Sequence, residues 1–239
     1  MQLLEEYKSD MRKLKTLLER GVDYRTVAAI LAQSQYILKD YPDERKYCFA
    51  YSKAVKDIAL RQYAETLKPE WDEMYWNALL FEAPEIFESY MMYTERDREP
   101  KERFYLPRKK CFDKIGIVPA MQDGFYYILC LSLVPGSGKT TLGEFFMSWV
   151  MGRHPDDYNL MSSHSGHVTD MFHTAVKNII MSKEYKWAET FPKVKIERIN
   201  EKESTINLNK YKPFASLTCR AIGASQTGVT RCNGYLYCE

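Results

Sequence analysis

One stretch near the middle of the chain constrains the fold more than any other. Residues 126–133 (Tyr-Tyr-Ile-Leu-Cys-Leu-Ser-Leu) form an apolar, aromatic-rich run of strand length. Residues 134–141 (Val-Pro-Gly-Ser-Gly-Lys-Thr-Thr) follow as a turn of small residues, and residues 142–150 carry apolar side chains at helical spacing. A buried strand, a glycine turn and a helix in this order are the setting of a Walker A loop. The stretch therefore predicts a nucleotide-binding loop between a strand and a helix.

This loop contains the residue types that phosphate binding requires. Small residues let the backbone N–H groups at a helix N-terminus come close to a phosphate. Lys139 is expected to reach the β- and γ-phosphates, and the Thr140 hydroxyl is expected to hold Mg²⁺. The loop is of a deviant kind, because Leu133 stands where the full pattern has its first glycine. Further contacts with the phosphates are expected from Pro135, Gly136, Ser137, Gly138 and Thr141.

Composition and charge are those of an ordinary globular protein. The chain has 239 residues, of which 45% are hydrophobic and 28% charged, and its net charge is +2. This charge produces no global basic field, so any contact with DNA would be a local patch. The six cysteines form no C-x-x-C pair and are expected to be reduced. The longest apolar run is far shorter than the roughly 18–20 residues of a membrane span. The N-terminus is acidic, unlike a signal peptide. We therefore expect a soluble intracellular protein.

The first part of the chain is predicted to be helical. Apolar residues recur at helical spacing over residues 1–20, and Gly21 would end that helix. Further helices are expected over about residues 23–41, 43–68, 71–80 and from 84 onward. Residues 95–103 form a mixed-charge run with a proline, which is typical of a linker. We therefore predict a helical N-terminal region over residues 1–100 and a second domain over residues 101–239.

The second domain is predicted to alternate strands and helices. Strands are expected at residues 158–163 and 214–222, a helix at about 168–181, and a hairpin within 192–209. The chain closes with Gly-Tyr-Leu-Tyr-Cys-Glu, which has the shape of a Walker B motif. In that motif a buried strand delivers a carboxylate, here Glu239, to the Mg²⁺ beside the loop. The pattern predicts an α/β domain in which Glu239 and Thr140 share one cation.

Three histidines form a weaker candidate site. His164, His167 and His173 lie close together in the sequence, but no carboxylate or cysteine stands at ligand spacing from them. His173 also falls within a predicted helix. A metal site is therefore not expected there, although the Ser/His loop follows a predicted strand and could lie near the nucleotide.

The order of these motifs resembles the large terminase subunit of tailed bacteriophages, the ATPase of the DNA-packaging motor. The resemblance covers residues 104–239. Its most specific parts are residues 134–142, 159–164 and 227–239. It implies a P-loop NTPase sheet core of the ASCE type, with ATP and Mg²⁺ as cofactors.

The resemblance also implies roles for single residues. Lys139 and Thr140 correspond to the residues that bind the phosphates and Mg²⁺, and Glu239 stands where the family has its Walker B aspartate. Arg231 is a candidate for the arginine that reaches the γ-phosphate of a neighbouring subunit, and an ordinary loop charge is the alternative. Residues 104–109 are similar to the adenine-side motif of some terminases. That similarity makes Arg108 a candidate contact to the base or a phosphate, and plain surface charge is the alternative.

The resemblance implies an ATP hydrolase that translocates duplex DNA into a procapsid. Its expected partners are DNA, the portal protein and the small terminase subunit. It would assemble as a homo-oligomeric ring in the host cytoplasm, with no membrane contact. The sequence ends at Glu239, before the family's second acid, coupling motif and nuclease domain. We therefore expect a truncated chain, incomplete at the C-terminus of its sheet, which binds nucleotide but hydrolyses ATP poorly or not at all.

Two other functions remain open from the sequence. One is a helicase-like or other P-loop ATPase, which helicase motifs in the parent gene, in place of a nuclease, would indicate. The other is a docking module in which residues 1–100 bind the portal or the small terminase and the nucleotide site is vestigial. Nucleotide affinity separates this second alternative from the ATPases. A nucleoside or shikimate-type kinase is disfavoured, because nothing resembles a lid over a substrate phosphate.

Overall fold

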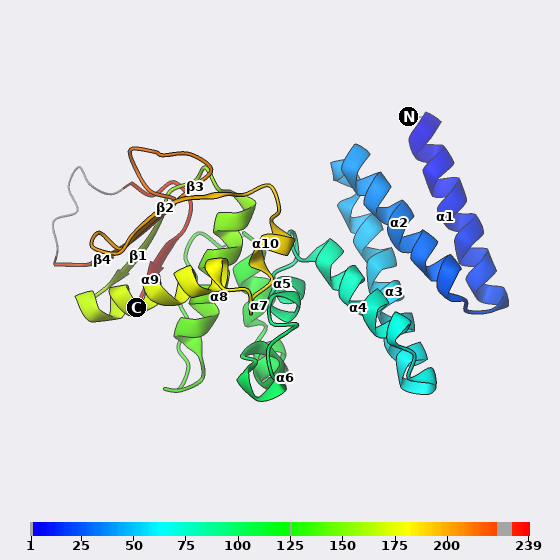
Figure 1. Ribbon diagram of the computed structural model, residues 1–239, viewed down its shortest axis with the longest axis horizontal. Coiled ribbons are helices and arrows are strands. Elements are labelled where there is room, and N and C mark those ends of the chain that lie inside the picture. Colours follow the sequence, from blue (N-terminus) through cyan, green and yellow to red (C-terminus); the bar gives the residue numbers. More distant parts are fainter. Residues whose placement is uncertain (1, 125, 224–230) are drawn as a thin grey trace. The chain divides into compact units, whose positions relative to one another are not determined.

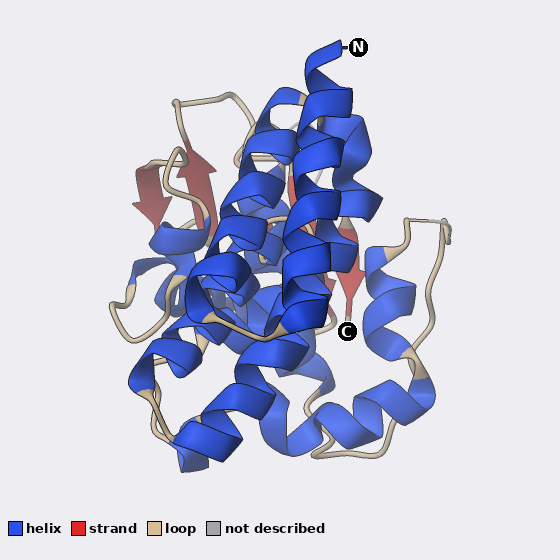
Figure 2. Ribbon diagram, turned by 90° about the vertical axis from the view of Figure 1, so that its right-hand side faces the viewer, coloured by secondary structure: helices blue, strands red, loops and turns tan. Residues whose placement is uncertain are grey.

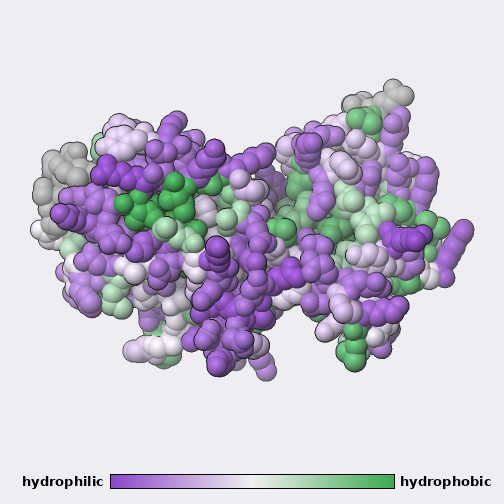
Figure 3. Space-filling view, in the orientation of Figure 1, coloured by the Kyte–Doolittle hydropathy of each residue, from purple (hydrophilic) through white to green (hydrophobic). Residues whose placement is uncertain are grey.

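The chain forms two compact units in this computed structural model, which describes residues 2–124, 126–223 and 231–239 (Figure 1). The units are Met1–Ala83 and Pro84–Glu239. The division therefore falls before the charged run and not at residue 100, where the sequence placed it. Hydrophilic side chains cover most of the surface that Figure 3 shows, as a chain with 28% charged residues predicts. Among the described helices, none combines the length and the apolar content needed to cross a bilayer.

The first unit consists of helices, as predicted (Figure 2). They are α1 (Gln2–Arg20), α2 (Tyr24–Asp40), α3 (Arg45–Thr66) and α4 (Pro69–Glu82), with a 3₁₀ turn, η1 (Pro42–Glu44). The Asp23 carboxylate accepts hydrogen bonds from the backbone N–H groups of Arg25 and Thr26, so Asp23 is the predicted cap of α2. The apolar stripes of the helices meet in one core that includes Met11, Ile30 and other buried residues.

The second unit contains shorter helices and one mixed sheet. Its helices are α5 (Phe87–Thr94), η2 (Pro100–Glu102), α6 (Tyr105–Ile115), α7 (Ile117–Gln122), α8 (Lys139–Arg153), α9 (Gly166–Met181) and α10 (Trp187–Thr190). Its strands are β1 (Asn159–Ser163), β2 (Ile196–Asn200), β3 (Thr205–Leu208), β4 (Leu217–Ala221) and β5 (Leu236–Cys238). The strand order is β2-β3-β4-β1-β5. Strands β4, β1 and β5 are parallel, whereas β2 and β3 form the predicted hairpin and β3 pairs antiparallel to β4.

The α5 helix belongs to this second unit because its aromatic side chains pack on α8. The ring of Phe87 lies 5.4 Å from that of Phe146 and 5.2 Å from that of Trp149. The Tyr90 hydroxyl shares a 2.6 Å hydrogen bond with Ser148, which is also buried. This packing explains why the unit begins at Pro84, since the aromatic face of α5 is buried among residues of α8.

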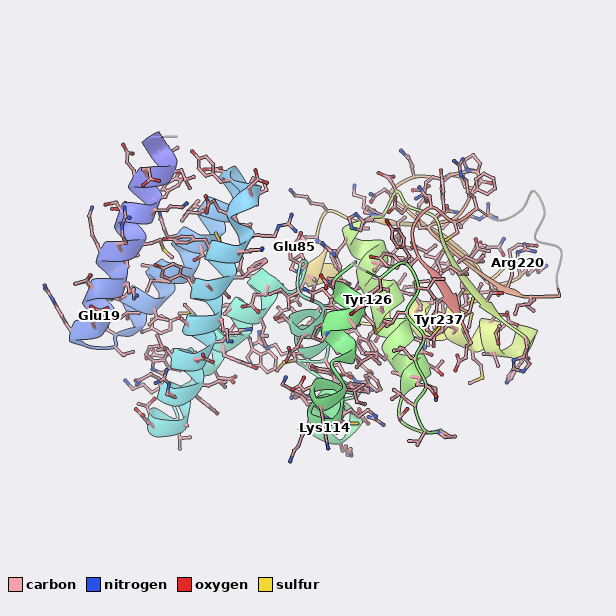
Figure 4. The ribbon with its side chains drawn as sticks, turned by 180° about the vertical axis from the view of Figure 1, so that it is seen from behind. Glu19, Glu85, Lys114, Tyr126, Arg220 and Tyr237 are labelled. Atoms are coloured by element: carbon pink, nitrogen blue, oxygen red, sulfur yellow. The ribbon has the colours of Figure 1, made fainter. Side chains whose placement is uncertain are left out.

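Helices α8 and α9 cover the same face of the sheet. Tyr237 of β5, labelled in Figure 4, is stacked on Phe172 of α9 at 5.1 Å. The same ring fills the space beside Gly143 of α8, where an added Cβ would lie 2.6 Å from it. Because one side chain touches both helices, both must lie on its side of the sheet. This arrangement brings the N-terminus of α8 to the end of β5.

The strand predicted at residues 126–133 is absent. These residues, where described, are neither strand nor helix, and Tyr127 and Ile128 are 105% and 81% exposed. Within the described chain, β5 pairs only with β1, and residues 126–133 form no ladder with its other edge. An apolar run of strand length becomes a strand only when a partner supplies the hydrogen-bond ladder. The predicted strand is therefore wrong, because these residues join no such ladder.

Strand β5 forms as predicted, but it is not the buried strand that a Walker B motif requires. It spans three residues at the edge of the sheet, and Leu236 is 58% exposed. The sequence also missed α6 and α7, which occupy residues 105–122 where only a lead into a strand was expected. Gly116 ends α6 in the left-handed region at φ 71°.

Candidate functional site

The loop before α8 adopts a conformation that depends on its two glycines. Gly136 and Gly138 have φ angles of 78° and 91°, in the region that L side chains rarely adopt. The Ser137 N–H group donates to the Val134 carbonyl at 3.3 Å, and the Leu142 N–H group donates to the Gly138 carbonyl at 2.9 Å. The latter bond is the first of α8, so the N–H groups before it have no partner within the helix. They form the positive end of the helix dipole, where an anion is favoured.

The Lys139 side chain folds back over this loop. Its ammonium group donates to the Leu133 carbonyl at 2.8 Å and to the Val134 carbonyl at 3.4 Å. The Ser137 hydroxyl is buried and makes no hydrogen bond to any described residue. A lysine held only by carbonyls and an unpaired buried hydroxyl fit a loop that accepts an anion.

The Thr140 hydroxyl donates to the Glu239 carboxylate, although 99 residues separate them in the sequence. The end of β5 is held at this position because the Glu239 N–H group donates to the Ser162 carbonyl at 3.0 Å. A hydroxyl and a carboxylate oxygen are ligands that Mg²⁺ accepts. Among the described residues no group of three or more His, Cys, Asp or Glu could hold a metal ion. A cation here would therefore need further oxygen ligands from a bound phosphate or water.

A second carboxylate lies one helical turn after Thr140. Burial, and then the charge of Glu239, raise the pKa of Glu144 to about 7. A carboxyl with this pKa is partly protonated at neutral pH. Nothing in the sequence singles out Glu144, because its burial and its nearness to Glu239 both arise from the fold.

The first turn of α6 lies against the loop. Gly138 has no room for a side chain, since an added Cβ would lie 2.5 Å from Cε2 of Phe104 and 3.1 Å from Nε of Arg108. The Arg108 guanidinium lies over the Phe104 ring, 4.8 Å from its centroid, and donates to the Phe104 carbonyl at 3.0 Å. The structure thus places Arg108 beside the loop, and its contact with a base or a phosphate stays a prediction. It also adds Phe104, whose four-residue spacing from Arg108 on a helix was the signal available.

Arg231 lies near the start of strands β1 and β5, whereas the loop lies near their ends. Its guanidinium lies 5.9 Å from the centroid of the Tyr158 ring, and Tyr158 immediately precedes β1. Glu239 follows the end of β5, which runs parallel to β1. The five residues of β1, at about 3.3 Å each, separate the start of the strand from its end by roughly 15 Å. Arg231 therefore does not reach the loop of its own chain. Thr227 and Gly228, which entered the resemblance beside it, lie outside the described residues.

The predicted absence of a histidine metal site rests on sequence alone, but the three side chains differ in their surroundings. His164 and His167 are exposed, whereas His173 is 2% exposed within α9. Burial lowers the pKa of His173. The Nε2 atom of His173 is buried and makes no hydrogen bond to a described residue.

The described residues therefore bring together Lys139, Thr140, Glu239 and Arg108 around one loop. Pro135 and Gly136 are exposed at its tip, and Thr141 continues into α8. Comparisons of the chain with protein-family models, with curated proteins and with solved structures found no match.

Proposed function

We propose that this chain binds Mg-ATP at the loop before α8 and is part of a P-loop ATPase. The observation that carries the proposal is the hydrogen bond between Thr140 and Glu239 at the N-terminus of α8. A contact between a loop threonine and a carboxylate at the end of a distant strand, beside a lysine, is not expected by chance. Their meeting is what the Walker A and Walker B motifs require of the two residues.

The residues of the loop divide the task. Lys139 and the first N–H groups of α8 would hold the phosphates, and Gly136, Ser137 and Gly138 would let the backbone approach them. Thr140 and Glu239 would hold Mg²⁺, which offsets the negative charge of the phosphates when it is bound. Arg108 would lie on the side of the loop that faces the base or the α-phosphate.

The proposed biological role is DNA packaging. By its resemblance to terminase large subunits, the chain would belong to an ATP-driven motor that moves duplex DNA through a portal protein, with a small terminase subunit as a further partner. Because Arg231 lies at the opposite end of the strands from Glu239, we assign it to the site of a neighbouring subunit in a ring. There it would stabilise the charge on the γ-phosphate.

Calorimetric titration of the chain with Mg-ATP tests the nucleotide site. Wild type should bind, and Lys139→Ala should lose roughly 10-fold or more in affinity, since one charge-assisted contact is removed. Lys177→Ala is the matched control. Lys177 forms an ion pair with Glu201 at 2.8 Å on a different part of the unit, so its loss should leave the affinity unchanged.

Absence of binding by the wild-type chain would contradict the proposal and favour the docking module. Equal binding by wild type and Lys139→Ala would place the nucleotide elsewhere. Binding together with steady ATP turnover, abolished by Lys139→Ala, would support the site but contradict the expected low hydrolytic activity.

A further inference from the structure

The Glu95 carboxylate is buried at the start of α6 and holds the first turn of that helix. It accepts hydrogen bonds from the Phe104 N–H group at 2.8 and 3.0 Å and from the Tyr105 N–H group at 3.0 Å. The residue is only 2% exposed. Phe104 itself supplies no side-chain cap to α6. Glu95 therefore takes the place of the missing cap, from a residue nine positions earlier in the chain.

The segment between Glu95 and α6 is folded so that this contact is fixed. The Arg103 guanidinium donates to the Arg98 carbonyl at 3.0 Å and to the Arg96 carbonyl at 2.7 Å. These bonds close the segment on itself. The charged run that the sequence treated as a linker is thus an ordered turn that presents one carboxylate to one helix end.

The first turn of α6 sets the position of the phosphate loop. The Phe104 ring is stacked on Phe145 of α8 at 5.7 Å, and its edge fills the space where Gly138 would carry a side chain. Arg108, one turn later, lies over the same ring and beside the same glycine. A shift of this turn would move the ring and the guanidinium together, and Gly138 lies in contact with both.

We infer that Glu95 is a positioning residue for the nucleotide site: it holds Phe104 and Arg108 against Gly138 and so maintains the loop in its binding geometry. The expected effect of Glu95 on nucleotide affinity rests on the proposed function. The expected effect of Glu95 on the loop conformation does not depend on that function. The carboxylate touches neither the loop nor any expected ligand atom and acts only through α6.

The effect on the loop is measured by NMR without nucleotide. The protein is made by cell-free synthesis with serine labelled with ¹³C at the carbonyl and glycine labelled with ¹⁵N. This labelling selects the glycine amides that directly follow a serine. In this sequence these belong to Gly138 and Gly166 alone. Gly166 has open space around it and serves as the internal reference. Glu95→Gln replaces one of the two accepting carboxylate oxygens with an NH₂ donor. The Gly138 peak should therefore move, and the Gly166 peak should stay.

The control is Glu82→Gln, which changes a carboxylate of matched burial, 1% exposed, in the first unit. It should leave both peaks in place even where it lowers thermal stability. If Glu95→Gln fails to fold, Glu95→Asp keeps the charge and shortens the side chain by one methylene, and the Gly138 peak should again move. An unmoved Gly138 peak in the folded variant would overturn the inference.

The effect on the nucleotide is measured as a double-mutant cycle. Glu95→Gln should weaken Mg-ATP binding roughly 3- to 10-fold. In an Arg108→Ala background the same change should have a smaller effect, because the residue through which Glu95 acts is gone. Equal effects in both backgrounds would indicate a general loss of stability and contradict positioning through Arg108. If wild type binds no Mg-ATP, the proposed function fails while the glycine spectrum still decides the role of Glu95.

Discussion

At Gly138, both the backbone conformation and the packing disfavour a side chain. Its φ of 91° disfavours any side chain, and the Phe104 ring occupies the place where a Cβ would stand. Gly136 has a similar φ of 78° but nothing within 4 Å of an added Cβ. The two glycines therefore separate the cost of the backbone conformation from the cost of the contact.

We expect Gly138→Ala to be more destabilising than Gly136→Ala. Both substitutions incur about 1–2 kcal/mol for the left-handed conformation. Gly138→Ala should cost a further 1–3 kcal/mol, roughly, because the Phe104 ring must move. Urea unfolding followed by the fluorescence of the second unit measures the difference. Equal losses in the two variants would contradict the contact with Phe104.

Glu144 should make stability depend on pH. Its pKa is raised from 4.5 to about 7 by burial and by Glu239, so the folded state holds the proton longer than the unfolded state. The stabilisation is complete below about pH 4.5 and is lost as the pH rises through about 7.

Glu144→Gln should remove this dependence. Relative to wild type, the variant should gain about 1–3 kcal/mol in the free energy of unfolding between pH 5 and pH 8. Denaturant titrations at the two pH values measure the gain. Glu197→Gln, on exposed β2, is the control and should show no such gain. A parallel pH dependence in wild type and Glu144→Gln would assign the effect to another group.

At the scale of elements, β5 decides whether the site forms, because Glu239 follows it directly. Asn159 fastens β5 to the sheet: its Oδ1 atom accepts from the Tyr235 N–H group at 2.8 Å, and its Nδ2 atom donates to the Ser216 carbonyl at 2.9 Å. It is 1% exposed. One buried side chain thus joins β1 to the strands on both of its sides.

Asn159→Ala should destabilise the second unit by roughly 1–3 kcal/mol, because it leaves a buried donor and acceptor unpaired. It should also weaken Mg-ATP binding by loosening the strand that carries Glu239. Asn233→Ala is the matched control, since the Asn233 side chain is exposed and accepts a bond from the Tyr158 N–H group at 2.7 Å. That variant should lose less than about 1 kcal/mol. Similar losses in both variants would rule out a special role for Asn159.

The helices were the elements that the sequence predicted best. In the first unit, apolar spacing, the Asp23 cap and the prolines mark α1 to α4 almost completely, because a helix satisfies its own backbone hydrogen bonds. Strands β1 and β4 were also found. Residues 126–133 differ from these strands, since their apolar character matches a buried strand while Tyr127 and Ile128 are exposed.

At the scale of the whole molecule, each unit encloses its own apolar core. In the first unit Ile30 is 2% exposed within that core. The unit has its own ion pair, between Lys56 and Glu82, which further joins α3 to α4. A substitution in one core should therefore be felt first in the unfolding of that unit.

Ile30→Ala should lower the stability of the first unit by about 2–5 kcal/mol, the usual cost of emptying a buried aliphatic site. Hydrogen exchange should then quicken in residues 2–83 and change less in residues 84–239. Leu60→Ala, at a site 48% exposed on α3, should have a much smaller effect. Equal quickening throughout the chain would indicate that the two units unfold as one.

The sequence by itself determined the helices of the first unit, α8 and α9, the glycine loop with Lys139 and Thr140, and the strand before Glu239. These features depend on neighbours within a few residues: caps, helical spacing and glycines that tolerate positive φ. Only the tertiary structure decided that Thr140 meets Glu239, that Phe104 packs against Gly138 and that Arg231 lies at the opposite end of the strands from the loop. It also left residues 126–133 outside the sheet. Each of these outcomes depends on residues far apart in the chain, because sheet order and helix docking are set by burial and pairing across the fold.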